Sequence, residues 1–386
     1  MGKKFKEVTL SYPPKGPIIY KRMVGDIPDG LNRGEIVKIK NKNGEFFGYA
    51  FYNPKSAITF RTITRDFSED FDIRDYIQKS LIKAVDFRKM FNIPSDFTNA
   101  YRLVHDWGDG LNGLTIDVFG ESAVVEIYSY GYYLLMDEIR DIVSKSLNGA
   151  EVFFTSSGYT QTMEGFELEE GVKKKVKIKE NNVIFEVVIG EGYKTGFFCD
   201  QRENRKYLTN FVEGKDVLDL FSYTGGFGIY AKRYGAKEVT CVDLDEWAVS
   251  QVKRNANLNN LRINAVRSDA FTYMRQMIEN SKLYDIVILD PNKLITSREN
   301  KEEGVIKYID LNKLALKLVK PGGIFVSCSC SGMLSMDEFV GVIKKSASIS
   351  KKLVKIFKKT GASIDHPFSV NYPEGEYLKV IWSVAD

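Results

Sequence analysis

The feature that most constrains the fold is an alternation of apolar runs with a glycine-rich turn and a helical segment in residues 216–245. The stretch reads DVLDLFSYTGGFGIYAKRYGAKEVTCVDLD. VLDLF has the composition of a buried strand, IYAKRYGA that of a helix, and EVTCVD that of a second strand. Strands that alternate with helices in this way predict a parallel, doubly wound α/β sheet.

The turn SYTGGFG between the first strand and the helix predicts a bound ligand. Glycines there carry no Cβ, so a ligand can approach the backbone closely. Asp243 ends the second strand, where a carboxylate can accept hydrogen bonds from two ribose hydroxyls. We therefore expect a nucleotide-like ligand at this turn.

Four aspartates end or flank four successive strands: Asp219, Asp243, Asp269 and Asp290. The carboxyl ends of parallel strands meet at one edge of the sheet, where ligands bind. Taken singly, each aspartate could be a helix N-cap or lie in a solvated loop. NAD(H) would place its pyrophosphate on a helix N-terminus. S-adenosylmethionine instead carries a sulfonium cation, which a group of carboxylates favours, so the four together predict S-adenosylmethionine.

The composition excludes several classes of protein. The 386 residues are 44% hydrophobic and 27% charged, with a net charge of +4, which suits a globular protein of two or three domains. The basic N-terminus has no apolar segment after it, and no apolar run is long enough for a membrane helix. Four cysteines without CxxC spacing and two histidines argue against a disulfide scaffold or a metal site. We expect a soluble, cytoplasmic protein that does not bind membranes.

Three domains are expected along the chain. Residues 1–68 read as short strands, with a hairpin at Asn43-Gly44, and predict a small β-barrel. Residues 69–174 combine amphipathic helices with strands and predict a small α+β domain. Residues 175–386 begin with a hairpin at Asn181-Asn182 and continue into the doubly wound sheet. A turn at 372–375 and a last strand predict an antiparallel hairpin that completes this sheet.

Several further motifs carry a family resemblance that covers nearly the whole chain. They are FYNPKS (51–56), YRLV with DGLNGLTID (101–117), YKTGFFCDQRENR (193–205), LDLFSYTGGFG, CVDLD, SCSCSG, and DHP with YPEG (365–375). With these motifs the chain resembles the ribosomal RNA cytosine-5 methyltransferases that join an N-terminal PUA domain, a small middle domain and a Rossmann-like class I methyltransferase domain.

The resemblance implies an enzyme that uses S-adenosyl-L-methionine and binds RNA, with ribosomal RNA as the expected partner; a homodimer is left open. The cofactor residues that we expect are Phe198, Asp200, Gln201, Asp219, Ser222, Tyr223, Thr224, Gly225, Gly226, Asp243, Leu244, Ser268, Asp269 and Asp290. Two departures stand out. Tyr193 replaces the family's usual glutamine. The segment DPNKL has Asn292 in place of a second proline and Leu294 in place of an aromatic residue.

The pair of cysteines in SCSCSG fits the chemistry that the resemblance implies. Carbon 5 of cytosine is a poor nucleophile until a thiolate adds to carbon 6. Cys328 and Cys330 are two residues apart, so both side chains point to one side of an extended segment. Cys330 lies nearer the carboxyl edge and matches the family's nucleophile, with Asp290 expected to hold the base edge. Cys328, Cys241 and Cys199 are interpreted as packing residues.

The resemblance implies that the N-terminal barrel binds structured RNA. The cations proposed for phosphate contacts are Lys21, Arg22, Arg33, Lys55, Arg61 and Arg65. Tyr128, Tyr130 and Tyr132 alternate on a predicted strand face and could stack bases, or could pack on a helix of the same domain. His366 precedes a proline and is interpreted as a turn residue, outside the catalytic set.

Three alternatives stay open at this stage. The enzyme could methylate a different base or atom, which Asn292 in the DPN segment would suit. The chain could instead be a non-catalytic RNA-binding assembly factor that retains the cofactor fold. A dinucleotide oxidoreductase is the third, and the four aspartates argue against it.

Overall fold

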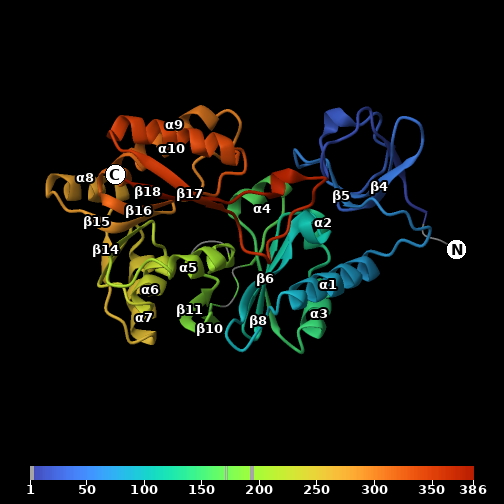
Figure 1. Ribbon diagram of the computed structural model, residues 1–386. Helices are drawn as coiled ribbons and strands as arrows, with labels where there is room; N and C mark the ends of the chain where they lie inside the picture. Colours follow the sequence, from blue (N-terminus) through green and yellow to red (C-terminus); the bar gives the residue numbers. More distant parts are fainter. Residues whose placement is uncertain (1–3, 170, 172, 192–194) are drawn as a thin grey trace. The chain divides into compact units, whose positions relative to one another are not determined.

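The computed structural model describes residues 4–169, 171, 173–191 and 195–386. The chain divides into two compact units (Figure 1). The N-terminal unit comprises Met1–Ile178, Val187–Phe197 and Asp365–Gly375, and the C-terminal unit comprises Lys179–Glu186, Phe198–Ile364 and Glu376–Asp386. Tyr193, which departs from the family motif, lies outside the described residues. The three-domain boundaries at 68/69 and 174/175 stay a prediction.

The N-terminal unit begins with a five-stranded sheet in the order β1-β3-β4-β5-β2. The strands are β1 (Glu7–Thr9), β2 (Ile18–Ile19), β3 (Ile36–Lys40), β4 (Phe46–Tyr52) and β5 (Phe60–Thr64), with the short 3₁₀ helix η1 at Lys21–Met23. The hairpin predicted at Asn43-Gly44 joins β3 and β4 and is confirmed. Val37, Ile39 and Phe60 are fully buried in the core of this sheet, so the sheet has a hydrophobic core of its own.

A second sheet follows in the same unit, in the order β6-β7-β8-β9. Its elements are α1 (Ile73–Met90), β6 (Ala100–His105), η2 (Asp106–Asp109), β7 (Leu114–Phe119), β8 (Ser122–Ile127), α2 (Tyr130–Tyr133), α3 (Met136–Ser146), β9 (Glu151–Thr155) and α4 (Gly158–Glu164). The strand predicted through Tyr128, Tyr130 and Tyr132 is wrong, because Ser129 caps a short helix there. Tyr132 is fully buried and packs edge-on against Phe51, so it cannot stack an RNA base.

Strands β10 (Lys174–Glu180) and β11 (Val183–Ile189) form the predicted hairpin. Asn181 and Asn182 at its turn have φ angles of 48° and 65°. Two consecutive left-handed residues make the tight turn that matches the twist of a hairpin, and asparagine tolerates this conformation. The turn prediction is therefore confirmed.

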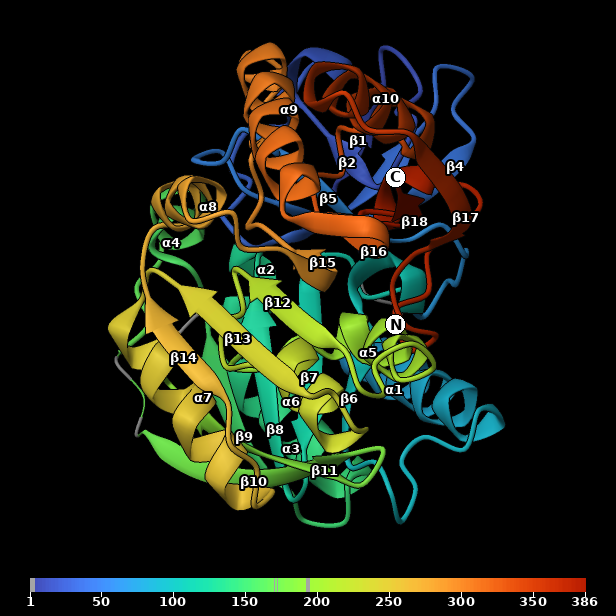
Figure 2. The same ribbon diagram turned by 60° about the vertical axis from the view of Figure 1, so that its left-hand side comes forward.

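The C-terminal unit is built on a seven-stranded sheet in the order β14-β13-β12-β15-β16-β18-β17 (Figure 2). The strands are β12 (Asp216–Leu220), β13 (Glu238–Asp243), β14 (Asn264–Arg267), β15 (Tyr284–Leu289), β16 (Val319–Ser329), β17 (Val354–Thr360) and β18 (Lys379–Ala385). All pairs from β14 to β16 are parallel, whereas β18 is antiparallel to both of its neighbours. The predicted parallel sheet with a terminal antiparallel hairpin is confirmed.

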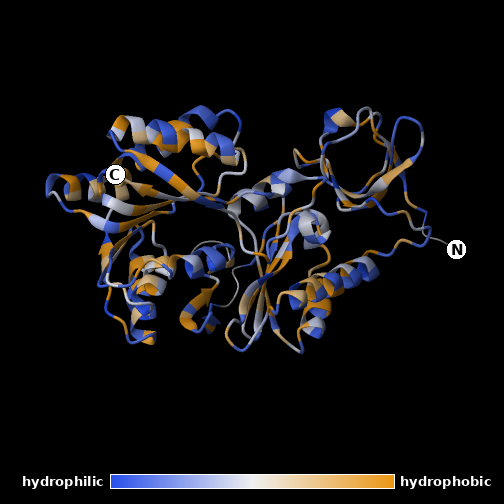
Figure 3. Ribbon diagram, viewed as in Figure 1, coloured by the Kyte–Doolittle hydropathy of each residue, from blue (hydrophilic) through white to orange (hydrophobic). Residues whose placement is uncertain are grey.

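Helices cover both faces of this sheet. They are α5 (Arg202–Leu208, after the 3₁₀ turn η3 at Cys199–Gln201), α6 (Gly226–Arg233), α7 (Glu246–Leu258), α8 (Ala270–Glu279), α9 (Lys301–Lys317) and α10 (Met336–Ser350); η4 (Pro373–Gly375) lies in the other unit. Buried side chains from α5, α6 and α7 share one core, and those from α8, α9 and α10 share another. The central strands β12, β13, β15, β16 and β18 are mostly apolar and buried (Figure 3), as expected for strands that are covered on both faces, whereas the edge strands β14 and β17 are largely exposed.

Candidate active site

The loop after β12 has an unusual backbone. Phe221, Tyr223 and Gly225 have φ angles of 60°, 48° and 86°, and the left-handed region is uncommon for residues other than glycine. A Cβ placed on Gly228, in the first turn of α6, would lie 2.2 Å from the Cys241 sulfur. Gly228 is therefore required by the close approach of α6 to the sheet, and the loop is held in a strained, specific shape.

Asp219 lies under this loop in β12 and is 1% exposed. Its Oδ2 accepts a hydrogen bond of 2.9 Å from the Gly228 amide, whereas its Oδ1 is buried without a partner among the described residues. Burial raises the pKa of Asp219 to about 8, against the lowering effect of the Gly228 amide, and Asp290 and Asp243 raise it further. Such a carboxylate favours a donor or a cation beside it.

Asp243 and Leu244 follow β13 at the adjacent strand end. The Asp243 carboxylate accepts hydrogen bonds from the Tyr223 amide (2.8 Å) and the Asp245 amide (3.0 Å), which fixes its orientation. Leu244 is 66% exposed. A large apolar side chain beside an oriented carboxylate suits a ligand with a ribose and a flat apolar ring.

Asp269 and Ser268 follow β14. The Asp269 side chain caps α8 by accepting a hydrogen bond of 2.9 Å from the Thr272 amide and is exposed. The Ser268 amide donates to the Asp243 carbonyl oxygen. The N-cap role, which the sequence left open for a single aspartate, accounts for the position of Asp269; its contact with a cofactor stays a prediction.

The segment that precedes α5 lies against the same strand ends. The Phe198 ring packs edge-on against Tyr223 at 5.2 Å. Asp200 accepts a hydrogen bond of 2.6 Å from the Tyr377 hydroxyl, and its other oxygen is buried without a partner among the described residues. Gln201 donates to Asp290 at 3.0 Å. The structure thus brings the predicted residues of this segment to the aspartates of the sheet.

Arg205 and Glu180 form a buried ion pair behind the loop. Arg205 donates two hydrogen bonds of 2.7 Å to the Glu180 carboxylate and one of 2.8 Å to the Phe198 carbonyl oxygen. A Cβ on Gly226 would lie 3.2 Å from the Arg205 guanidinium. Sequence reasoning missed this pair, which supports both the 198–201 segment and the start of α6.

Asp290 follows β15, the strand that pairs in parallel with β12. Burial and the neighbouring Asp200 raise the pKa of Asp290 to about 7, although the bond from Gln201 opposes this shift. A carboxyl group with this pKa is present in both protonation states near neutral pH. It can therefore donate or accept a proton at a ligand atom.

At the end of β16 the cysteine side chains lie on one face of the strand and the serine side chains on the other. Cys328 is fully buried and Cys330 is partly exposed. Both belong to the face that α5, α6 and α7 cover, as the two-residue spacing predicts. Burial raises the pKa of the Cys328 thiol well above its ordinary value, and Asp290 raises it further. The Cys330 sulfur lies 3.9 Å from the Pro291 carbonyl oxygen, next to Asp290.

The serines of the same segment face α9. Ser327 donates to Asn312 at 2.6 Å, and the hydroxyls of Ser329 and Ser331 bond to the Tyr308 hydroxyl at 3.0 and 2.9 Å. Tyr308 and Asn312 were not predicted. The signal that could have found them is the strict alternation SCSCS, because buried hydroxyls need partners on one face of the strand.

Lys379 is a further residue that the sequence did not indicate. It begins β18, is 2% exposed, and donates to the carbonyl oxygens of Ser331 (2.6 Å) and Tyr377 (2.7 Å). Burial lowers the pKa of Lys379 to about 8, while the proximity of Cys330 acts in the opposite direction. A buried lysine beside the candidate nucleophile has no equivalent in the predicted site.

Two predicted surface or loop residues have other partners. Arg61 is buried and bonds to the Tyr128 carbonyl oxygen and to Asn112, so the prediction that it contacts RNA phosphates is wrong. His366 bonds to Asp365 at 3.0 Å within the N-terminal unit, and its exclusion from the catalytic set stays a prediction. Lys21, Arg22 and Lys55 are exposed.

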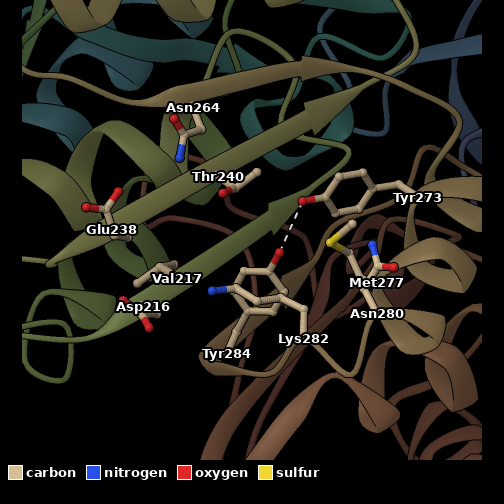
Figure 4. A pocket seen from close by; sticks show the side chains of 10 residues that line it. All are labelled: Asp216, Val217, Glu238, Thr240, Asn264, Tyr273, Met277, Asn280, Lys282 and Tyr284. Atoms are coloured by element: carbon tan, nitrogen blue, oxygen red, sulfur yellow. Dashed lines mark hydrogen bonds between the residues drawn. The ribbon is translucent and has the colours of Figure 1, made fainter.

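A surface hollow of about 500 Å³ lies at the opposite edge of the sheet (Figure 4). Asp216, Glu238 and Tyr284 line it from the amino ends of their strands, and the hydroxyls of Tyr273 and Tyr284 are 3.1 Å apart. Ligands of doubly wound sheets bind at the carboxyl ends, so this hollow is separate from the candidate site. Within the described residues, no group of His, Cys, Asp or Glu has the arrangement of a metal site, and no helix is long and apolar enough to span a bilayer.

Comparison with known proteins gives the class of this chain. Residues 163–357 match the family described as S-adenosylmethionine-dependent methyltransferase, and residues 15–65 match the PUA-like domain. The first match covers just over half of the 386 residues. The chain therefore belongs to the S-adenosylmethionine-dependent methyltransferases, with a PUA-like domain before the methyltransferase fold. The dinucleotide oxidoreductase alternative is wrong.

Curated proteins that align with nearly the whole chain define a narrower group within the methyltransferases. A protein of Alteromonas mediterranea named ribosomal RNA large subunit methyltransferase I is 33% identical over 96% of this chain and 96% of its own. A Methanocaldococcus jannaschii protein, provisionally named ribosomal RNA large subunit methyltransferase MJ1653, is 35% identical over 92% of this chain and 90% of its own. The chain belongs to this family.

A solved structure shares the fold. It is that of SMU.776, described as a candidate methyltransferase complexed with SAH, which aligns with a TM-score of 0.81 at 23% identity, covering 98% of this chain and 99% of that one.

The residues at the carboxyl edge fit S-adenosylmethionine. Buried oxygens of Asp200 and Asp219, and the Ser222 hydroxyl, have no partner among the described residues, so the site holds acceptors for a cationic ligand with amino and hydroxyl donors. Leu244 offers an exposed apolar face. The individual contacts of the predicted cofactor residues stay predictions.

Proposed function

We propose that this protein methylates carbon 5 of a cytosine in ribosomal RNA, with Cys330 as the nucleophile. The relatives' names support ribosomal RNA as the substrate. The observation that carries the cysteine assignment is the position of Cys330, which is partly exposed and lies 3.9 Å from the carbonyl oxygen of the residue after Asp290. Nucleophile and proton-exchanging carboxyl group therefore belong to neighbouring strand ends.

The cofactor would be held by the strand ends described above. Asp243 would accept hydrogen bonds from the ribose, Leu244 would cover the adenine, and the acceptors of Asp219 and Asp200 would face the charged amino-acid part. When bound, S-adenosylmethionine supplies an electrophilic methyl group. The remaining steps depend on residues of this chain.

The Cys330 thiolate would add to carbon 6 of the pyrimidine, and the displaced electron pair would make carbon 5 nucleophilic. Asp290 would hold N3 and the exocyclic amine, because its pKa of about 7 lets it donate a proton to N3 as charge develops on the ring. After methylation, loss of the carbon 5 proton to a base and release of the thiolate restore the aromatic ring.

A labelling experiment tests the proposal. Unmodified ribosomal RNA is incubated with the protein and methyl-labelled S-adenosylmethionine, and the nucleosides are separated. We expect labelled 5-methylcytidine from the wild type, loss of activity by at least about 10³-fold in Cys330→Ala, and retention in Cys328→Ala, the matched control. Full activity of Cys330→Ala would overturn the assignment.

A different target atom is the second candidate, because the exposed Asn292 amide in the loop after Asp290 could hold an amino group. The same nucleoside separation distinguishes the two, since a product other than 5-methylcytidine favours the second. Absence of any labelled nucleoside, with RNA still bound, favours a non-catalytic assembly factor. The homodimer stays a prediction that light scattering of the purified protein tests.

A further inference from the structure

Lys379 is a buried, charged side chain that bonds to the residue after Cys330. A buried ammonium group is costly unless it is hydrogen-bonded or paired with an opposite charge. Two of its three N–H donors reach the carbonyl oxygens of Ser331 and Tyr377 at 2.6 and 2.7 Å. The first bond reaches across to the residue after Cys330, and the second is local, to the residue two positions before Lys379.

The strand register explains why the lysine reaches this position. Ser329, the last residue of β16, pairs with Lys379, the first residue of β18. Cys330 therefore begins the turn directly after the pair, and the Lys379 ammonium closes this turn through the Ser331 carbonyl oxygen. The Lys379 ammonium group thus fixes the backbone next to Cys330 and also brings a positive charge near the Cys330 sulfur.

The charges around Lys379 favour a thiolate at Cys330. Of the groups that stabilise the ammonium form of Lys379, Cys330 is the foremost, followed by Glu376 and Glu338; Lys293 opposes them. The interaction is reciprocal, because a cation that is stabilised by a thiolate stabilises that thiolate equally. Glu338 is also engaged by Lys301 and by the cap of α10, and the charge of the exposed Glu376 is screened by solvent, so Cys330 is the group that Lys379 can affect most.

We propose that Lys379 is a positioning residue for Cys330, whose ammonium group fixes the turn after β16 and holds the Cys330 sulfur as the thiolate. This inference rests on the proposed function only for the attack on the pyrimidine. In that step the sulfur electron pair forms the bond to carbon 6, the carbon 5–carbon 6 π pair shifts to carbon 5 and is delocalised toward N3, where Asp290 would supply the proton, and Lys379 keeps its own proton. On elimination the pair returns to sulfur, so the lysine is unchanged over the cycle.

The test measures the reactivity of the thiol and needs no RNA. The purified full-length protein is alkylated with iodoacetamide between pH 6 and 10, and the rate at Cys330 is followed by peptide mass spectrometry. The variants are Lys379→Met, Lys379→Arg and the control Lys352→Met. Lys352 is a matched control because it also donates to a backbone carbonyl oxygen of this sheet, that of Val319 at 3.1 Å.

Loss of the charge in Lys379→Met should move the midpoint of the Cys330 alkylation profile upward by about one to three pH units. Lys379→Arg keeps the charge and should stay within about half a unit of the wild type, as should Lys352→Met. An unchanged midpoint in a folded Lys379→Met protein, or an Arg variant that behaves like the Met variant, would overturn the proposal.

Should Lys379→Met fail to fold, Lys379→Arg decides the question. The wild-type alkylation rate should fall below the value expected for a single ionisation above about pH 8, where Lys379 loses its proton, and this deviation should vanish in the Arg variant. The same deviation in both refutes the inference. Because no outcome depends on methylation, failure here is distinguishable from failure of the cytosine assignment.

Discussion

Replacing Glu180 by Gln removes one partner of the buried ion pair behind the loop that follows β12. Glu180 is 0% exposed and receives two hydrogen bonds of 2.7 Å from Arg205. Burial on its own would lower the pKa of Arg205, but Glu180 outweighs burial and raises it. Arginine keeps its proton in proteins, so the variant would carry a buried positive charge whose carboxylate partner is gone.

The magnitude follows from that uncompensated charge. Breaking a buried pair by removing one partner costs about 3–5 kcal/mol, and the remaining bond from Arg205 to the Phe198 carbonyl oxygen offsets little of it. For a unit of this size, about 4 kcal/mol corresponds to a fall in Tm of about 12 °C. We also expect weaker S-adenosylmethionine binding, because Arg205 positions the 198–201 segment.

Urea unfolding followed by circular dichroism measures the free energy, and calorimetry measures cofactor affinity. The matched control is Glu246→Gln, which breaks an exposed pair with Arg267 whose side chains are 76% and 59% accessible. Exposed pairs contribute about 0–1 kcal/mol. If Glu180→Gln lost no more stability than Glu246→Gln, the reasoning that the loop depends on a desolvated ion pair would be refuted.

Three further predictions come from the same site. Gly228→Ala should destabilise the protein by about 1–3 kcal/mol, because its Cβ would lie 2.2 Å from the Cys241 sulfur, and Cys241→Ala should restore part of the loss in a double mutant measured by urea unfolding. Because the pKa of Asp219 is raised to about 8, the folded cofactor-free protein retains a proton that the unfolded chain releases, so its stability should fall from about pH 4 to about pH 8; Asp219→Asn should flatten this profile, and an unchanged slope would contradict the assignment. Tyr308→Phe should cost about 1–3 kcal/mol by leaving the Ser329 hydroxyl without its partner, and a thermal shift no larger than that of a surface Tyr→Phe change would argue against this role.

The sheet could be predicted from sequence because its signals are local. The strand, turn and helix of residues 216–245 each have a periodicity that a short window contains, and the two-residue spacing of Cys328 and Cys330 fixes their common face. The paired asparagines at 181–182 likewise specify a turn without reference to the rest of the chain. Where a pattern within a few residues determines the local structure, the prediction and the structure agree.

The predictions that failed concern side chains whose positions depend on residues far away in the sequence. Tyr132 has the pattern of a strand residue, but its ring fills a space beside Phe51, 81 positions earlier in the sequence. Arg61 reads as a surface cation, yet it lies within 3.8 Å of Glu164. Lys379 could not be predicted because its partner, the Ser331 carbonyl oxygen, becomes a neighbour only when β18 pairs with β16. Such residues follow from tertiary packing, which no local pattern encodes.

The DPN segment shows how the same physical requirement can be met by other residues. A second proline would stiffen the loop after Asp290 by restricting its backbone. Here Pro291 is buried, the Ile295 amide donates to the Ser331 hydroxyl at 3.2 Å, and a Cβ on Gly304 would lie 2.7 Å from the Leu294 carbonyl oxygen. The loop is thus hydrogen-bonded to the turn after Cys330 through Ile295 and packs closely against α9 at Leu294. Because tertiary contacts restrict the loop at two points, the exposed Asn292 can replace proline without freeing the loop.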